Sequence, residues 1–289
     1  GAYRISGGAS RFDEIHEKVM RSLLRRLSTA PFPLLKTYKH WPYFVPDNTV
    51  VVASLVLYDE IHSIERPDVV KNWLRYVEQN LTDPKTGMIA FYADDAGKRA
   101  GPVRGSGVAW NGFYLPFIDR AFAEKQYRLA KESLAVNLAF GGAALREVPR
   151  GEPSIADIDS GPVVFGLSTS GTGFIVAGAR QFGDDQFASD VMRLGELVGS
   201  AVNVRGKKRY LFSPLVGDAI ILAANTATRW NMQYLARSSH SAPRSSQSTA
   251  SGNKPPEHQN SYARQVLGDP VYMSEKPSRP GGKLGRRQY

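Results

Sequence analysis

The feature that most constrains this fold is a recurring apolar stretch of helical length that carries few charges. Four such stretches begin near residues 47, 106, 160 and 216, which gives a repeat of about 54 to 59 residues. Charged segments with apolar residues every three or four positions alternate with them, as expected of amphipathic helices. Repeats of this kind are typical of stacked helical hairpins with one inner and one outer helix in each pair.

The predicted outer helices each have recognisable boundaries. Pro67 and Asp119 stand where a helix is expected to begin, since proline suits the first turn and aspartate caps it. The predicted amphipathic helices cover residues 11–28, 67–81, 119–136 and 184–199. Between the second and third of them, residues 83–97 predict a glycine-turned hairpin with a short strand over 88–92.

The third apolar stretch is the most unusual segment. Asp157 and Asp159 precede it on a predicted turn, and Pro162 stands where a first helical position is expected. No charged residue follows until Arg180, and the segment is rich in Gly, Ser and Ala. A helix without a polar face must be buried on all sides. Its polar small residues argue against a membrane span, so we expect an inner helix with acids at its N-terminal end.

We therefore predict an all-α fold, an (α/α)6-type toroid of repeated helical hairpins with one small β-hairpin. Only four pairs and a leading outer helix are evident, so pairs are missing upstream, or the ring is open, or another subunit of a homo-oligomer completes it. The toroid is assigned to residues 1–236. Residues 237–289 hold nine Lys/Arg against three Asp/Glu and are rich in Ser, Pro and Gly, which predicts a disordered basic tail.

Composition excludes several classes of protein. The chain has no cysteine, so disulfides, thiol nucleophiles and Cys-ligated zinc are ruled out within it. It has no Walker loop, HExxH or GxSxG motif, and we expect neither cofactor nor metal. No signal peptide is evident and the chain begins at Gly1, so we expect a processed or excised piece from either the cytoplasm or the periplasm. We expect no specific nucleic-acid partner and only weak tail contacts with anionic surfaces.

Four ordered motifs resemble the bacterial linalool dehydratase/isomerase-like helical toroids. They are YKHWPYFVPDNTVVVASL from Tyr38, RGSGVAWNGFYLPFIDRAFAEKQY from Arg104, LREVPRG from Leu145 and DIDSGPVVFGLSTSGTGF from Asp157. The resemblance spans roughly residues 10–230 and implies an (α/α)6-type barrel with its pocket at one end. In that family the terpene chemistry is associated with cysteines as well as an aspartate and tyrosines, and the absence of cysteine here argues against alkenol dehydration by that route.

Carboxylates at the predicted pocket are the candidate catalytic groups. Asp47 opens one inner helix, where it serves as an N-cap, as a catalytic acid or base, or as both. Asp157 and Asp159 alternate on an extended turn and therefore point the same way. Sugar hydrolysis needs carboxylates from two loops, about 5–5.5 Å apart for retention and about 6.5–9.5 Å for inversion. Asp47 with Asp157 or Asp159 is the expected pair.

Aromatic and cationic residues near these acids are the candidate binding groups. Aromatic rings beside carboxylates suit stacking on a sugar or cradling an apolar ligand, although they equally suit a hydrophobic plug. Cations near the acidic pair suit structural ion pairs or bidentate binding of an anion. The candidate substrate-binding residues are Tyr38, His40, Trp41, Tyr92, Arg104, Trp110, Arg146, Glu147 and Arg150.

Two functional hypotheses follow. The first is an enzyme that performs carboxylate acid/base chemistry in a central cavity, as a hydrolase or lyase on a saccharide ahead of a dehydratase or isomerase on a small alcohol. The second is a non-catalytic ligand-binding or assembly module tethered by its basic tail. Paired carboxylates, one with a raised pKa, favour the enzyme, whereas acids used only as helix caps favour the module.

Overall fold

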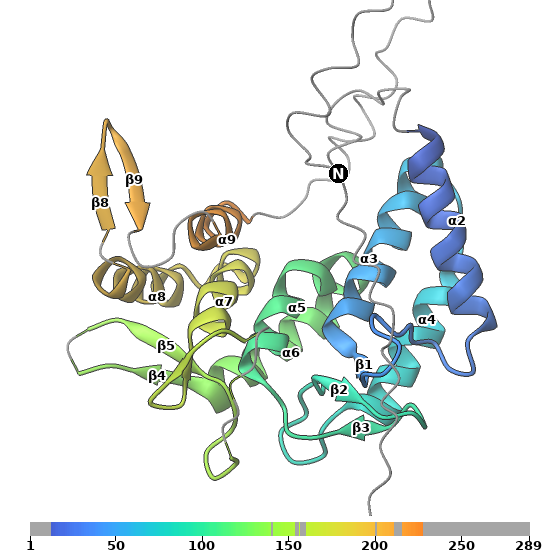
Figure 1. Cartoon of the computed structure of the whole chain (residues 1–289), viewed down its shortest axis with the longest axis horizontal. Coiled ribbons are helices and arrows are strands. Elements are labelled where there is room, and N and C mark those ends of the chain that lie inside the picture. The colour runs from blue at the N-terminus through green and yellow to red at the C-terminus, as the bar shows by residue number, and fades with distance from the viewer. Residues whose placement is uncertain are drawn as a thin grey trace, which may run out of the picture. The chain divides into compact units, whose positions relative to one another are not determined.

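The protein is mostly helical in the computed structural model, which describes residues 13–139, 141–153, 156, 160–199, 201–210 and 216–227. Eight α-helices and three small antiparallel sheets occur in these ranges (Figure 1). The predicted mostly helical character is confirmed, and small antiparallel sheets occur where one β-hairpin was predicted. Within the same ranges, no helix is both long and apolar enough to cross a membrane.

Along the chain, helices that pack on one another in a row alternate with helices that pack against that row. They are α2 (Asp13–Thr29), α3 (Val45–His62), α4 (Pro67–Tyr76), α5 (Gly105–Ile118), α6 (Arg120–Leu134), α7 (Thr169–Phe182), α8 (Asp185–Val198) and α9 (Val216–Asn225), with a π-helical turn η2 (Val77–Leu81) after α4. Helices α3, α5, α7 and α9 pack in series, while α2 and α4 pack on α3, α6 on α5 and α7, and α8 on α7 (Figure 1). This is the predicted alternation of inner and outer helices. A closed ring of six pairs stays a prediction.

The strands collect where inner helices begin. One sheet has the order β1 (Tyr43–Phe44), β2 (Tyr92–Ala93), β3 (Arg99–Ala100), and a second has the order β4 (Ala135–Asn137), β5 (Ala143–Arg146), β7 (Leu167–Ser168), β6 (Val163–Val164). Strands β8 (Ala201–Val204) and β9 (Lys207–Tyr210) form a hairpin. Since β1 runs directly into α3 and β7 into α7, while β3 precedes α5 by four residues, the first two sheets lie at the N-terminal ends of these helices.

The third inner helix begins later than predicted. Pro162 is not in a helix; α7 starts at Thr169, and the Ser168 hydroxyl caps it by accepting from the Gly171 N–H at 3.0 Å. Phe165 and Gly166 both have positive φ, which a right-handed helix does not allow. The chain therefore turns back at these residues, and β6 pairs with β7.

The predicted strand over residues 88–92 is also wrong, apart from its last residue. Only Tyr92 belongs to a strand there, and Ile89 forms an isolated bridge with Thr82. Backbone hydrogen bonds join Met88 to Asp83 and Ala90 to Leu81 on either side of this bridge, and the Ile89 N–H donates to the Gln126 side chain of α6 at 2.9 Å. The predicted glycine turn is therefore present at Gly87, and a hairpin of named strands joins β2 to β3.

Helices α5 and α7 approach each other unusually closely. A Cβ added at Gly171 would lie 2.9 Å from backbone atoms of Gly105 and Ser106, and one at Gly112 would lie 3.3 Å from the Gly178 backbone. Glycine at these positions lets the two backbones touch, which places their N-terminal ends side by side. Buried residues of both helices share one hydrophobic core with α6 and α8, including Val108, Ala130, Ile175 and Val191.

Candidate functional site

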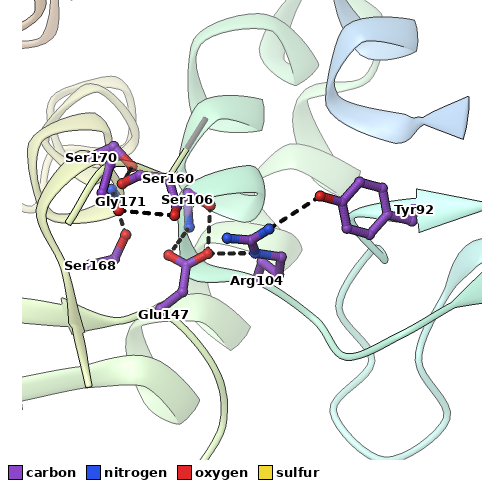
Figure 2. A network of polar contacts seen from close by, with 9 residues as sticks. Tyr92, Arg104, Ser106, Glu147, Ser160, Ser168, Ser170 and Gly171 are labelled. Carbon is purple, nitrogen blue, oxygen red and sulfur yellow. Dashed lines mark hydrogen bonds and ion pairs between the residues drawn. The ribbon is translucent and has the colours of Figure 1, made fainter. Parts of the chain in front are cut away.

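A buried carboxylate is the centre of the polar network at the beginning of α5. Glu147, which follows β5, has no exposed surface. Its Oε1 accepts from Arg104 Nε at 2.7 Å and from the Ser106 hydroxyl at 2.8 Å, and its Oε2 accepts from the Ser106 N–H at 3.2 Å (Figure 2). The negative charge thus meets a guanidinium and the N-terminus of a helix, both of which stabilise it.

The backbone fixes this carboxylate from two sides. The Gly105 N–H donates to the Glu147 carbonyl at 2.6 Å, and the Glu147 N–H donates to the Gly166 carbonyl at 3.0 Å. A Cβ at Gly105 would lie 2.1 Å from the Arg146 carbonyl oxygen, so no larger residue fits there. The strand β5, the turn between β6 and β7 and the first turn of α5 are therefore joined at Glu147.

Arg104 carries the network towards an aromatic cluster. Its side chain is almost fully buried, and Nη1 donates to the Tyr92 hydroxyl oxygen at 3.2 Å (Figure 2). The guanidinium carbon lies 4.7 Å from the centre of the Phe91 ring, a cation–π geometry. Arg104 thus reaches between a buried acid and a half-buried phenol.

The aromatic cluster begins at the surface and ends at Arg104. Ring centres are 5.8 Å apart for Tyr38 and Phe44, 5.1 Å for Phe44 and Tyr92, and 4.6 Å for Phe91 and Tyr92. Tyr38 is 55% exposed, whereas Phe44 and Phe91 are buried. An aromatic cluster that ends at a buried cation and a phenol hydroxyl suits a ligand with a hydroxyl on an apolar body.

A known family matches most of this chain. The family model described as linalool dehydratase/isomerase matches residues 5–210, which is more than two thirds of the chain. The chain belongs to the linalool dehydratase/isomerase family. The resemblance drawn from the four sequence motifs is thereby confirmed, and three of those motifs supply Phe44, Arg104 and Glu147 to the network described above. Membership favours an enzyme of the dehydratase/isomerase type.

Asp47 lies in a different setting from the one predicted. It is inside the first turn of α3, whose N-cap is Phe44, so it does not cap the helix. Its Oδ2 accepts from the Thr37 hydroxyl at 2.6 Å. It lines a shallow hollow of about 100 Å³ between α2 and α3, together with Leu23, Arg26, Leu35, Lys36, Thr37, Asn48 and Val51. Pro46 occupies the start of the helix, which moves the boundary ahead of Asp47.

The other predicted carboxylates, Asp157 and Asp159, lie outside the described residues. Their neighbour Ser160 is described and is fully buried. Its carbonyl accepts from the Ser170 hydroxyl at 2.7 Å, in the first turn of α7 (Figure 2). The position after Asp159 is therefore anchored at the N-terminal end of α7, where its backbone touches that of α5.

The predicted aromatic and cationic residues separate into distinct environments. His40, Trp41 and Arg150 are exposed, with Trp41 59% accessible. Trp110 is not at a loop end as predicted, because it lies inside α5 and packs on Phe113, Tyr114 and Phe174. Tyr92, Arg104 and Glu147 do come together.

Sequence reasoning missed Ser106, Phe44 and Phe91 as parts of this network. Ser106 looked like one more small residue in an apolar helix, and the Phe residues looked like core. The signal that points to Ser106 is its position two residues after Arg104, at the start of a helix that lacks a capping side chain of its own. Burial and contact with Arg104 could not be inferred from residue spacing.

Proposed function

We propose that the protein is an acid/base enzyme that removes water from a small, largely apolar alcohol or moves its hydroxyl group. The site lies at the N-terminal ends of α3, α5 and α7. The observation that carries this proposal is the hydrogen bond from buried Arg104 to the Tyr92 hydroxyl, beneath the aromatic cluster. Family membership supports the reaction type.

Loss of water from an alcohol needs a proton donor at the leaving oxygen and a base at the neighbouring carbon. Tyr92 is the proposed donor: its proton passes to the leaving hydroxyl, the C–O bond breaks, and water departs. Arg104 donates to the phenol oxygen, so it would stabilise the charge that develops there as the proton leaves. Glu147 holds Arg104 in position and offsets its charge.

The proposed base is Asp157 or Asp159, which then takes a proton from the adjacent carbon as the double bond forms. Support comes from the anchoring of Ser160 at the N-terminus of α7, which follows Asp159 directly in the chain. Since the chain contains no cysteine, aspartate and tyrosine are the groups we assign to proton transfer. Return of water at another carbon would complete an isomerisation.

The test is product analysis with a panel of alkenols, including linalool, and a parallel panel of oligosaccharides. Gas chromatography of the alkenol reactions should show dienes or isomeric alcohols. Tyr92→Phe should lower the rate by about 10²–10⁴-fold without changing the melting temperature. Tyr58→Phe is the matched control, because Tyr58 lies in α3 and its ring packs on His62, outside the proposed site.

Each outcome has a clear meaning. Alkenol turnover that depends on Tyr92, and on Asp157 or Asp159, supports the proposal. Release of reducing sugar without alkenol turnover would replace it with the saccharide hydrolase or lyase hypothesis. Binding of either ligand class without turnover would leave a ligand-binding module.

A further inference from the structure

Arg146 is a cation beside the network that has no acceptor among the described residues. In strand β5 and the residue after it, Arg146 is half-buried whereas Leu145 and Glu147 on either side of it are fully buried. Among the described residues, no side chain or carbonyl forms a hydrogen bond or ion pair with the Arg146 guanidinium, and its Nε is shielded from solvent without a partner. A buried donor that loses water and gains no acceptor costs free energy, so such groups usually meet a ligand or an ordered water.

The turn between β6 and β7 leaves space next to this guanidinium. Arg146 pairs with Leu167 across the sheet, and a Cβ at Gly166 would lie 3.6 Å from Arg146 Nη1. Because Gly166 has no side chain, the turn does not cover that side of the Arg146 guanidinium. The same turn is joined to the polar network around Glu147, since the Gly166 carbonyl accepts from the Glu147 N–H.

Phe165 is an exposed apolar residue at this turn. It is 96% exposed and has a φ of 52°, although two-residue hairpin turns with positive φ favour Asn, Asp or Gly at that position. An aromatic residue in this conformation costs free energy, and its exposed ring gains nothing from burial. Neighbouring Val164 is half exposed as well. Such a costly arrangement is expected where the ring contacts a ligand.

We propose that Arg146 and the β6–β7 turn form a subsite for an anionic group of the substrate, with the apolar body of the substrate against Phe165. A planar guanidinium fork matches either a carboxylate or a phosphate ester. This inference rests on the proposed function and deepens it: the substrate is an alcohol that also carries an acidic oxygen group. Glu147, adjacent to Arg146 in the chain, connects the subsite to Arg104 and Tyr92.

The experiment compares three probes that share one aromatic body: benzyl alcohol, mandelate and benzyl phosphate. Mandelate differs from benzyl alcohol by a carboxylate, and benzyl phosphate by a phosphate on the hydroxyl. Calorimetric titration of the full chain should show mandelate or benzyl phosphate binding at least about tenfold more tightly than benzyl alcohol. Whichever of the two binds more tightly identifies the anion.

Substitutions assign the difference to Arg146. Arg146→Gln should bring the affinity for the preferred anion down to that for benzyl alcohol, and Arg146→Lys should give an intermediate value because the charge remains without the fork. Arg193→Gln is the matched control: it removes the same charge from an exposed α8 residue that is 3.3 Å from Asp190. Phe165→Ser should weaken all three probes alike.

The outcomes separate this inference from the proposed function. Equal affinity for the neutral and anionic probes, or an anion preference unchanged in Arg146→Gln, overturns the subsite whether or not alkenols are turned over. A lower melting temperature in Arg146→Gln with no loss of anion preference means that Arg146 serves the fold, which also overturns it. Anion binding that depends on Arg146, with no turnover of any alcohol, would keep the subsite and contradict the enzyme.

Discussion

At the residue scale, Glu147 is a buried side chain whose charge is compensated by a guanidinium and a helix N-terminus. Its carboxylate is fully buried, and its two oxygens accept hydrogen bonds from Arg104 and from the hydroxyl and N–H of Ser106. A buried ion pair adds little net stability compared with an apolar pair, but loss of one partner leaves a charge without compensation. The pair is therefore best explained as a means of positioning Arg104.

Glu147→Gln should lower the free energy of unfolding by about 3–5 kcal/mol, because the Arg104 charge then stays buried alone. Urea denaturation measures the change. Arg104→Met combined with Glu147→Leu should cost less than the sum of the single substitutions. The control is Asp95→Asn, which breaks the exposed Lys36–Asp95 pair and should cost no more than about 1 kcal/mol. A loss of unfolding free energy in Glu147→Gln no larger than that in Asp95→Asn would contradict the compensating role of Glu147.

Phe165→Asn should raise the free energy of unfolding by about 1 kcal/mol. Asn adopts positive φ with less strain, and removal of a ring that is 96% exposed loses almost no packing. The measurement is the urea midpoint of each protein without ligand. A lower midpoint for the variant would mean that the Phe165 ring packs against something that stabilises the fold, and the strain argument would fail.

At the element scale, the contact between α5 and α7 depends on the absence of side chains. Gly171→Ala places a methyl 2.9 Å from the backbone of Gly105 and Ser106, so one helix must move. We expect a loss of about 1–3 kcal/mol in unfolding free energy. Gly195→Ala is the matched control in α8, where nothing lies within 4 Å of the added methyl, and it should gain about 0.5–1 kcal/mol. Stabilisation by both substitutions would show that the helices tolerate separation.

Asp184 joins α6 to α8 and makes the stability of the fold depend on pH. It caps α8 through the Phe187 N–H, and it accepts from Tyr127 at 2.7 Å and from Lys131. Burial by itself raises the pKa of Asp184, but the hydrogen bonds from Lys131 and Tyr127 and the charge of Lys131 outweigh it, so the pKa lies below its ordinary value. A lowered folded-state pKa stabilises the protein above the unfolded-state pKa, and this contribution disappears as the pH falls through the folded-state pKa.

Asp184→Asn should therefore be less stable than the parent near pH 7, and the difference should shrink below about pH 4, near the unfolded-state pKa. Urea midpoints across this range measure it. Asp190→Asn provides a control, since Asp190 is an α8 acid paired with the exposed Arg193. A difference between Asp184→Asn and the parent that stays constant from about pH 3 to pH 7 would contradict the assignment.

The elements were predictable from the sequence to the extent that periodicity and caps decide them. The Asp119 cap, Pro67 at the start of α4 and the alternation of inner with outer helices agree with the structure. The predictions failed where contacts distant in sequence decide: Gln126 takes the Ile89 N–H, and β7 pairs with β5 where a longer helix was expected. At the site, residue types predicted Tyr92, Arg104 and Glu147, but only the fold shows that one buried acid joins them.

At the scale of the whole molecule, the described helices end at Asn225 and the family match ends at residue 210. The predicted boundary at residue 236 lies beyond both, and residues 237–289 lie outside the described residues. Their composition, nine Lys/Arg against three Asp/Glu, is the basis for the predicted basic tail. The remaining residues are far less basic for their number, so any contact with anionic surfaces is expected to depend on the tail.

Deletion of residues 237–289 should therefore test whether residues 1–236 fold, and whether they bind anionic surfaces, without the basic tail. We expect the shortened chain to keep the circular dichroism spectrum and melting temperature of the full chain, because the helices that the structure describes precede the deletion. The full chain should sediment weakly with vesicles containing anionic lipid, and this should vanish as salt shortens the Debye length below about 10 Å. The shortened chain should not sediment at any salt concentration. If it unfolds, residues after 236 belong to the helical domain; if it still binds vesicles, the body carries the basic surface.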